Sequence, residues 1–274
     1  MDLSIIIVNY KEPGFLRQCL KGIQRARLKL PYEVIVVDNA SGDRSVGMVR
    51  EHFPDVVLLP QNRNLGFAAG NNVGLRRAAG RYVLLLNADI AVFEGALERL
   101  MTFLNDHPKV GMIAPQLLNP DQTIQTTCYR FPSPLIPMLR RTPLGMFGLA
   151  RAALRQYLML DWDHHEIRPI EWALGACLMV RRRAIEEVGL LDEQFFMYFE
   201  DVDWCRRFWE AGWPVIYLPT VALVHYHQRM SAENPGLNGV FQKLTRIHIQ
   251  SGLKYFRKYF RKPNPIITTH EILV

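Results

Sequence analysis

The sequence lacks the features that mark secreted, membrane-spanning or metal-stabilised proteins. Its 4 cysteines are far apart and form no C-x-x-C pair, which argues against a zinc ribbon and a disulfide framework. No uninterrupted apolar segment reaches the roughly 18 residues that a bilayer span needs. No basic and then apolar leader precedes the first apolar run at residues 3–10. These absences predict a cytoplasmic protein in a reducing compartment.

Common nucleotide-binding and nucleic-acid-binding motifs are also missing. There is neither a G-x-G-x-x-G loop nor a GK[ST] loop. No RNP-type aromatic motif, zinc finger or helix-turn-helix is present, so we expect no nucleic acid as a partner. The net charge is nevertheless +7, with 33 Lys and Arg against 26 Asp and Glu. Such a charge favours an anionic partner, which by charge alone could be nucleic acid, an anionic membrane surface or a phosphorylated ligand.

What the chain does contain is an alternation of apolar runs and helical patterns. Residues 3–10, 32–37 and 56–59 read as strands, each followed by a helical segment, and residues 82–86 read as a fourth strand buried on both faces. Successive β-α units imply a parallel sheet with right-handed connections. The sequence therefore predicts an α/β fold, with a Rossmann-like, mostly parallel sheet flanked by helices.

Two acids follow strands of this predicted sheet. Asp38 ends the second strand and Asp89 follows the fourth, in the block RYVLLLNAD at 81–89. The carboxyl ends of parallel strands share one edge of a sheet, where ligands bind in open α/β folds. Both carboxylates are therefore expected to face one crevice, Asp89 as a holder of a metal or a ligand hydroxyl. Capping of the next helix is the alternative for Asp89.

Polar and small residues elsewhere fit the same crevice. The loop at 62–72 offers amides and close backbone approach through Asn64, Gly66 and Asn71. Gly175 and Ala176 interrupt a later strand, expected at 172–180, where the backbone can approach a ligand closely.

A second concentration of acids follows an aromatic run at 195–199. Glu200, Asp201 and Asp203 fall in the first turn of an expected helix, and apolar neighbours would raise the pKa of one of them, as a general base requires. Plain helix capping is the alternative. His225 ends a further apolar strand and is a candidate metal ligand. The residues at 240–262 read as an amphipathic helix rich in Lys, Arg, Tyr and Phe, which suits a membrane surface, a nucleic acid or the main domain.

The segment at 115–168 is harder to interpret. Its prolines and interspersed arginines predict a loop and then an amphipathic helix, which either covers an active site, dips into a lipid interface or packs as a plain excursion. For His164 and His165 a structural or acceptor-contacting role is favoured over a metal site, because adjacent side chains point in different directions on most backbones.

Taken together, the ordered blocks resemble a family 2 glycosyltransferase of the GT-A fold, in the bacterial branch that includes rhamnosyltransferases. The resemblance covers the chain from residue 3 to about 260. It depends on a set of blocks that are weak singly and strong in this order: SIIIVNY, VIVVDNAS, NRNLGFAAGNN, GRYVLLLNAD, WALGACLMVRR, FFMYFEDVDWCRR and VHYH.

The resemblance implies a nucleoside diphosphate sugar donor. Its base would bind Asp38 in a pocket lined by Val8, Asn9 and Tyr10, and its nucleoside would contact the loop with Asn64, Gly66 and Asn71. Asn87 and Asp89 take the place of the D-x-D motif. Asp89, with His225, would bind the Mg²⁺ or Mn²⁺ that bridges the diphosphate. Asn87 departs from the family pattern, and a single carboxylate still suits an ion whose shell phosphates and waters complete.

The resemblance also implies an inverting transfer in which Asp201 takes a proton from the acceptor hydroxyl, with Glu200 beside it in the catalytic pair. Acceptor contacts are expected at Trp172, Gly175, Ala176 and Asp203. The favoured donor is dTDP-rhamnose, with a UDP-sugar as the alternative. The acceptor would be a saccharide or lipid-linked saccharide of a cell-surface polysaccharide.

Three regions are expected. Residues 1–115 form the nucleotide-sugar-binding half, residues 116–230 form the acceptor-binding and catalytic half of the same domain, and residues 231–274 form a basic amphipathic helix and tail. The lipid-linked acceptor and the basic tail together suggest peripheral association with the inner face of the cytoplasmic membrane. The alternative function is a basic nucleic-acid-binding or membrane-binding module without catalysis.

Overall fold

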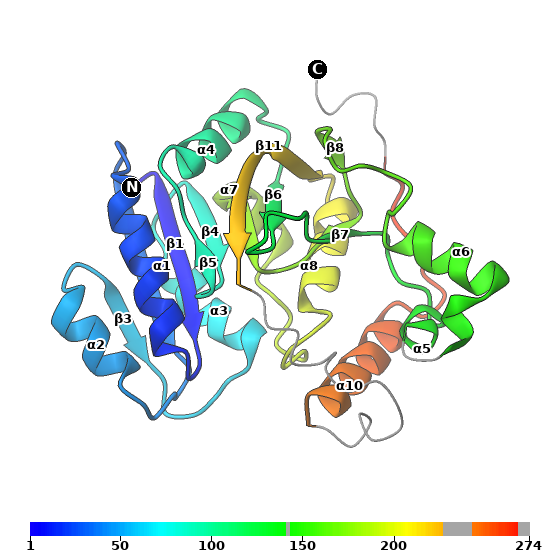
Figure 1. The fold of residues 1–274 in the computed structure, drawn as a ribbon, viewed down its shortest axis with the longest axis horizontal. Coiled ribbons are helices and arrows are strands. Elements are labelled where there is room, and N and C mark those ends of the chain that lie inside the picture. The colour runs from blue at the N-terminus through cyan, green and yellow to red at the C-terminus, as the bar shows by residue number, and fades with distance from the viewer. Residues whose placement is uncertain (141–142, 227–242, 268–274) are drawn as a thin grey trace.

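The computed structural model describes residues 1–140, 143–226 and 243–267. A nine-stranded sheet forms its centre, with the order β3-β2-β1-β4-β10-β6-β11-β5 and with β8 paired to β11. Helices cover the sheet on both sides (Figure 1). This is the α/β architecture that the sequence predicts, and both halves of the chain contribute strands to the one sheet.

The parallel half of the sheet follows the sequence closely. β1 (Leu3–Asn9), β2 (Tyr32–Asp38), β3 (Val57–Pro60) and β4 (Tyr82–Leu86) lie within about one residue of the predicted strands. All pairings among them are parallel. Their apolar residues are buried because helices pack on the sheet. These helices are α1 (Pro13–Ala26), α2 (Ser45–His52) and α3 (Phe67–Arg77).

The other half of the sheet contains both parallel and antiparallel pairs. β6 (Met112–Leu118) and β11 (Val215–His225) pair in parallel, but β10 (Cys177–Arg181) lies antiparallel between β4 and β6. The chain leaves β6 at the carboxyl edge and starts β10 at that same edge, because Cys177 pairs with Leu86. The returning strand must therefore run in the opposite direction.

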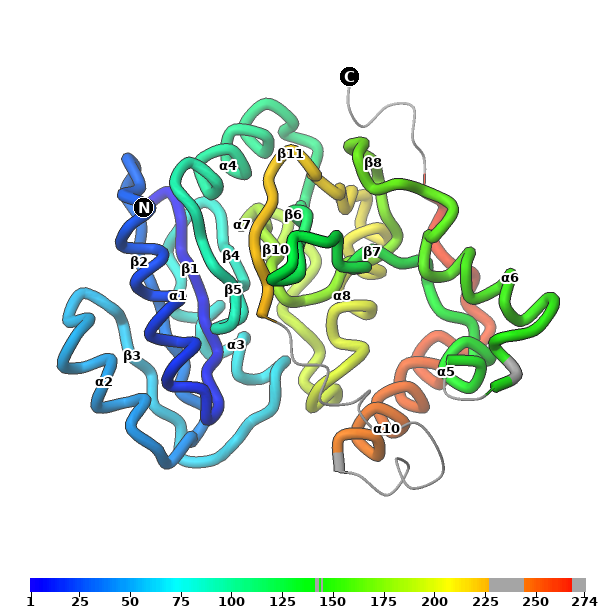
Figure 2. Tube along the Cα trace, in the orientation of Figure 1, coloured from blue at the N-terminus to red at the C-terminus, as the bar shows by residue number. Residues whose placement is uncertain are grey.

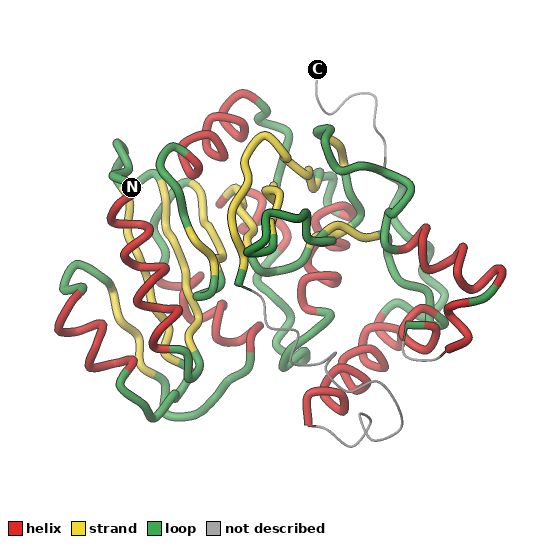
Figure 3. Tube along the Cα trace, viewed as in Figure 1, coloured by secondary structure: helices red, strands yellow, loops and turns green. Residues whose placement is uncertain are grey.

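Short elements link these strands. β5 (Ile90–Ala91) follows β4 and pairs with the end of β11, and α4 (Ala96–Asp106) leads to β6. α7 (Arg182–Val188) follows β10, and α8 (Glu200–Glu210) precedes β11. Figure 3 shows how strands and loops alternate across the centre of the molecule.

An excursion between β6 and β10 carries small elements to one end of the molecule (Figure 2). β7 (Cys128–Tyr129) pairs with β9 (Trp172–Ala173) in a separate two-stranded sheet. Between them lie α5 (Ile136–Leu139), the 3₁₀ helix η1 (Pro143–Met146), α6 (Gly148–Tyr157) and β8 (Arg168–Pro169). The predicted loop and amphipathic helix are both present.

α10 (Lys243–Lys258) is the helix expected near the C-terminus. Its buried side chains include Tyr255, and Tyr259 just beyond it is also buried, so the helix docks on the rest of the chain. Within the described residues, no helix combines the length and the apolar character that a membrane crossing requires.

Candidate active site

Four segments meet at the carboxyl edge of the sheet. They are the turn after β4 with Asn87 and Asp89, the end of β11 with His225, the link from β9 to β10 with Gly175 and Ala176, and the start of α8. The chain separation between them is large, so only the sheet order brings them together. Hydrogen bonds between the segments fix their relative positions, as described below.

Asp38 is held in a buried polar cluster at the ends of β1 and β2. Its Oδ1 accepts from Asn9 Nδ2 at 2.9 Å and from the Ser41 hydroxyl at 2.6 Å, while Oδ2 accepts from the Ser41 amide at 3.1 Å. The carboxylate is 3% exposed. Asn9 Oδ1 is buried without a hydrogen-bond partner among the described residues, so it remains available to a donor group of a ligand. Tyr10 beside it is exposed, and Val8 is partly buried.

The loop before α3 is fixed by Asn39, a residue that the sequence did not single out. Asn39 Nδ2 donates to Asn64 Oδ1 at 3.0 Å and to the Gly66 carbonyl at 2.9 Å, and Asn39 Oδ1 accepts from Leu65 N at 2.9 Å. Its adjacency to Asp38 in VIVVDNAS was the available signal. The loop predicted to hold the nucleoside is therefore tied to the end of β2.

Gly66 has a structural reason to be glycine. Its φ is 85°, and a Cβ atom there would stand 2.2 Å from the Phe196 carbonyl oxygen. The amide of Phe67 donates to that same carbonyl at 2.7 Å. Asn71, on α3, is buried and donates to the Phe67 carbonyl at 3.0 Å. The loop thus packs against the segment that leads into α8.

Asp89 and His225, the two candidate metal ligands, lie in contact. His225 Nε2 is 3.3 Å from Asp89 Oδ1, and the amide of the next residue, Tyr226, donates to the Asp89 carbonyl at 2.9 Å. His225 Nδ1 lies 2.9 Å from Gln125 Oε1, and Gln125 Nε2 donates to the His225 carbonyl at 2.9 Å. Because the Gln125 amide oxygen can only accept a hydrogen bond, Nδ1 of His225 carries the proton. Nε2 is then the nitrogen with the lone pair, and it faces Asp89. Gln125 is a second residue that the sequence did not identify.

This pair fits a divalent cation as a partial ligand set. The described residues contain no group of three or more His, Cys, Asp or Glu placed to hold a metal. A carboxylate and an imidazole suffice for Mg²⁺ or Mn²⁺ when the oxygens of a diphosphate and waters complete the shell. The side chain of Asp89 is 16% exposed, whereas that of His225 is wholly buried.

Asp201, at the start of α8, is poised as a base. Its Oδ2 accepts from the Gly175 amide at 3.1 Å and its Oδ1 from the Val202 amide at 2.9 Å. Burial raises its pKa from 3.8 to about 6, although the two amide hydrogen bonds oppose the shift. A carboxylate with this pKa is largely ionised at neutral pH and is a stronger base than an ordinary aspartate.

Glu200 differs from its neighbour. It is buried, and its Oε2 has no hydrogen-bond partner in the described part of the chain. Burial and then the charge of Asp201 raise its pKa well above the ordinary value. The two carboxyls therefore differ in environment, and ionisation of either one raises the pKa of the other.

A short backbone path joins the segment of Asp89 to Asp201. The amide of Asn87 donates to the Ala176 carbonyl at 2.8 Å, next to the Gly175 amide that donates to Asp201. A Cβ on Gly175 would lie 3.4 Å from the Asp201 Cβ and 3.3 Å from the ring of Phe67. Glycine at 175 thus lets the base pack close to the backbone that carries Asp89.

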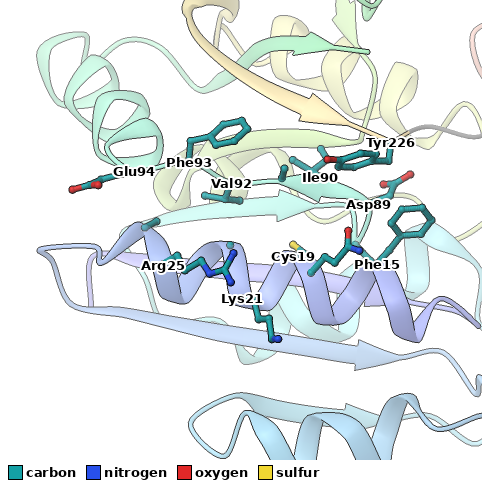
Figure 4. A pocket seen from close by; sticks show the side chains of 15 residues that line it. Phe15, Cys19, Lys21, Arg25, Asp89, Ile90, Val92, Phe93, Glu94 and Tyr226 are labelled. Carbon is teal, nitrogen blue, oxygen red and sulfur yellow. The ribbon is translucent and has the colours of Figure 1, made fainter. Parts of the chain in front are cut away.

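A groove of about 560 Å³ opens beside Asp89, between α1 and the segment at 88–94. Figure 4 shows Phe15, Asp89 and Tyr226 near one end and Arg25 and Glu94 near the other. The rings of Phe15 and Tyr226 are 6.1 Å apart. The groove therefore leads away from the metal pair along α1.

Two expected acceptor contacts have other surroundings in the structure. Trp172 is 6% exposed, stacks on Tyr129 with ring centroids 4.4 Å apart, and donates from Nε1 to the Arg130 carbonyl. Asp203 is wholly buried. Its oxygens meet Arg207 at 2.8 Å, Lys258 at 2.5 Å and the hydroxyl of Tyr259 at 2.8 Å. Since these donors saturate it, Asp203 ties α10 to α8 and does not face an acceptor. Sequence alone could not reveal Lys258 and Tyr259 as its partners, because they lie at and just beyond the end of α10, more than 50 residues away.

His164 and His165 are away from this edge. His164 is buried and stacks on Trp162 at 4.3 Å, and burial lowers its pKa. His165 is exposed, and its amide donates to Asp163. The structural interpretation of His164 agrees with these contacts.

The fold and the site define a glycosyltransferase of the GT-A class. Residues 4–158 match Glycosyl transferase family 2, more than half of the chain, so the protein belongs to this family. It is 30% identical over 244 residues to the N-acetylglucosaminyl-diphospho-decaprenol L-rhamnosyltransferase of Mycobacterium tuberculosis, covering 85% of this chain and 78% of the relative. A low-salt glycan biosynthesis hexosyltransferase of Haloferax volcanii is 29% identical, covering 75% and 61%.

Solved structures support the same fold. S. aureus TarS 1–349 in complex with UDP has a TM-score of 0.55 at 16% identity, covering 82% of this chain and 60% of that one. GalNAc-T7 with UDP, GalNAc and Mn²⁺ has a TM-score of 0.62 at 14% identity, covering 94% and 48%. The mannosyltransferase of Pyrobaculum calidifontis with GDP-Man and Mn²⁺ has a TM-score of 0.57 at 20% identity, covering 96% and 65%. This chain thus spans less than two thirds of each of these three.

Proposed function

We propose that the protein transfers a sugar, with rhamnose favoured, from a nucleoside diphosphate donor to a saccharide or lipid-linked saccharide acceptor, with inversion at the anomeric carbon. The supporting observation is the carboxyl of Asp201, held by two amides and joined by backbone to the Asp89–His225 pair. The rhamnosyltransferase relative favours rhamnose as the sugar and a lipid-linked acceptor.

In this mechanism Asp201 accepts the proton of the acceptor hydroxyl as that oxygen forms its bond to the anomeric carbon. The bond from that carbon to the diphosphate breaks on the opposite face, and its electron pair leaves with the nucleoside diphosphate. Glu200 is buried beside Asp201, and burial and the charge of Asp201 raise its pKa, which disfavours a second ionised carboxylate that could act as a nucleophile. One base without a nucleophile supports inversion rather than retention.

The donor would lie across the ends of β1, β2 and β4. Asp38 and Asn9 would meet the base, and the loop held by Asn39 would meet the nucleoside. Asp89 and His225 would hold Mg²⁺ or Mn²⁺, which supplies positive charge against the diphosphate when bound. Gln125 would keep the imidazole in the tautomer that binds.

The acceptor would approach from the side of Gly175 and Ala176, close to Asp201. With a lipid-linked acceptor, the enzyme would work at the inner face of the cytoplasmic membrane. This location is part of the proposal.

Calorimetric titration of the purified protein with dTDP, UDP and GDP, each with Mn²⁺ and with chelator, tests the donor side. We expect metal-dependent binding of one diphosphate, with dTDP favoured. Incubation with the matching sugar donor and a pyrophosphate-linked acceptor, followed by NMR of the product, then gives the anomeric configuration. Retained configuration, or no binding of any nucleotide, contradicts the proposal.

A further inference from the structure

The positive charge of the protein is concentrated in two stretches. Residues 130–160 and 243–267 contain 12 Lys and Arg and no Asp or Glu. The rest of the chain has 21 Lys and Arg against 26 Asp and Glu, so it is net acidic. We call the described part of these two stretches the acid-free surface. The net charge of +7 thus reflects one region rather than a basic protein as a whole.

The same stretches carry most of the exposed large apolar side chains. Of 14 such side chains among the described residues, 10 lie in the acid-free surface. This concentration is far above what singly scattered surface residues give, and such patches mark interaction sites. The ten are Leu135, Met138, Met146, Phe147, Leu149, Leu160, Ile249, Leu253, Phe260 and Ile266.

Three of the ten side chains lie on α10 and its continuation, on the side opposite the docked side of the helix. Its buried side includes Ser251 and Tyr255. Ile249, Leu253 and Phe260 follow at spacings of 4 and 7 residues, which places them along one exposed side of the helix and its continuation. Leu253 is 67% exposed and Phe260 71%.

Cations flank this apolar side of α10. Arg246, Lys254, Arg257 and Arg261 are all exposed, and the guanidinium of Arg261 lies 5.3 Å from the ring centroid of Phe260. An exposed apolar stripe with long cationic side chains beside it is typical of helices that lie in a lipid interface.

The second part of the acid-free surface has the same composition. Met146 and Phe147 are 70% and 68% exposed, and Leu149 at the start of α6 is 90% exposed. Arg151 and Arg155 on α6 are exposed beside them. Figure 1 shows α5, α6 and α10 at one end of the molecule, the end opposite α2.

We propose that the acid-free surface docks on an anionic lipid surface, with α10 and the η1–α6 segment inserting their apolar side chains at the headgroup boundary. The positive charge alone would also suit nucleic acid, but binding to nucleic acid would not bury the exposed Leu, Met and Ile side chains in an apolar environment. A lipid interface accepts both the apolar side chains and the cations. The surface is separate from the proposed active site, so its test does not depend on the identity of the donor.

Co-sedimentation of the full chain with vesicles tests the proposal. One set contains equal parts of phosphatidylglycerol and phosphatidylcholine, and the other contains phosphatidylcholine alone. We expect binding to the anionic vesicles that weakens with salt. Arg257→Gln with Arg261→Gln should lower the partition coefficient by about tenfold or more. Leu253→Ser with Phe260→Ser should lower it at least comparably, because the exposed apolar area is lost.

Lys29→Gln with Arg50→Gln is the matched control. Both residues are exposed and lie outside the acid-free surface, and this pair removes the same net charge. An equal loss of binding in this control would mean that only overall charge matters and would overturn the proposal. If the parent protein did not bind the anionic vesicles, the proposal would also be overturned. Binding to RNA instead of vesicles, unaffected by the changes at Leu253 and Phe260, would overturn it as well.

Nucleotide titration of the same variants separates the two proposals. The surface variants should bind the donor nucleotide with the affinity of the parent protein. Vesicle binding without any nucleotide binding would leave the docking surface intact and remove the proposed function. Nucleotide binding without vesicle binding would contradict the docking surface and leave the proposed function standing.

Discussion

The two carboxyls at the start of α8 are adjacent in the chain but differ in their hydrogen bonds and in the causes that raise their pKa values. Asp201 receives two amide hydrogen bonds, whereas Glu200 has an unpartnered oxygen among the described residues. Hydrogen bonds to the ionised form limit the rise in the pKa of Asp201 to about 6. Asp201 is therefore the group able to act as a base at neutral pH.

Asp201→Asn should remove the basic carboxylate while keeping the size of the side chain. We expect kcat to fall by about a hundredfold to ten thousandfold, the usual contribution of a general base. Donor affinity should stay within about twofold because the donor contacts lie elsewhere. Steady-state kinetics with calorimetry measure both quantities. An equal loss of donor affinity would make Asp201 a binding residue.

The pH dependence of kcat/KM should reveal the same carboxylate. Activity requires the ionised form of Asp201, so kcat/KM should fall as the pH drops through about 6. A full pH profile at fixed metal concentration gives this limb. A flat profile across that range would argue that another group takes the proton.

Asp89→Ala should remove the metal-dependent part of donor binding. The affinity for the nucleotide measured with Mn²⁺ should drop to the value measured with chelator, because the retained imidazole lacks its charged co-ligand. Asp55→Ala, which removes an exposed acid elsewhere, is the control. Undiminished metal dependence in Asp89→Ala would exclude Asp89 as a ligand.

At the scale of elements, α10 supports the segment that ends in the base. Ser251 donates to the Met197 carbonyl at 2.8 Å, and Lys254 donates to the Gln194 carbonyl at 2.7 Å. Within that segment Tyr198 and Phe199 both have positive φ, 67° and 69°, a costly conformation for aromatic residues. Contacts from α10 help to hold this strained turn.

Lys258→Met tests that support. Lys258 joins Asp192 at 2.7 Å and the wholly buried Asp203 at 2.5 Å, so its loss leaves Asp203 with fewer donors. We expect the free energy of unfolding to fall by about 1–3 kcal/mol. Turnover should fall while donor KM is unchanged, as urea unfolding and kinetics would measure.

Lys254→Met is the matched control for that change. It removes an exposed lysine from the same helix with a bond to a single carbonyl, and should cost under about 0.5 kcal/mol. If both variants behaved alike, the ion pairs of Lys258 would have no special role.

At the scale of the whole molecule, stability should depend on pH through the buried carboxyls. The folded state holds the protons of Glu200 and Asp201 more tightly than the unfolded chain does, because burial raises both pKa values. Stability should therefore fall as the pH rises from about 4 to about 6. Glu200→Gln cannot ionise, so its stability should fall less steeply. Urea unfolding at a series of pH values compares the two slopes, and equal slopes would contradict a raised pKa at Glu200.

The sequence predicted the elements better than their assembly. Apolar runs ending in Asp38 and near Asp89 located the strands and the sheet edge where these acids lie, because burial on both faces leaves a clear local pattern. Asn39 and Gln125 were missed because their importance lies in partners, and Gln125 meets His225 100 residues away. The direction of β10 was missed for a similar reason, since an apolar run has the same composition in either direction.

The position of β10 also has a consequence for synthesis. β4 has β1 as its partner on one side, and its other side is covered only by Cys177–Arg181, about ninety residues later in the chain. While the ribosome makes the excursion, this apolar strand presents an unpaired edge of the kind that invites association with other chains. Nascent chains that stop before β10 should therefore recruit chaperones or aggregate, whereas chains that include it should not.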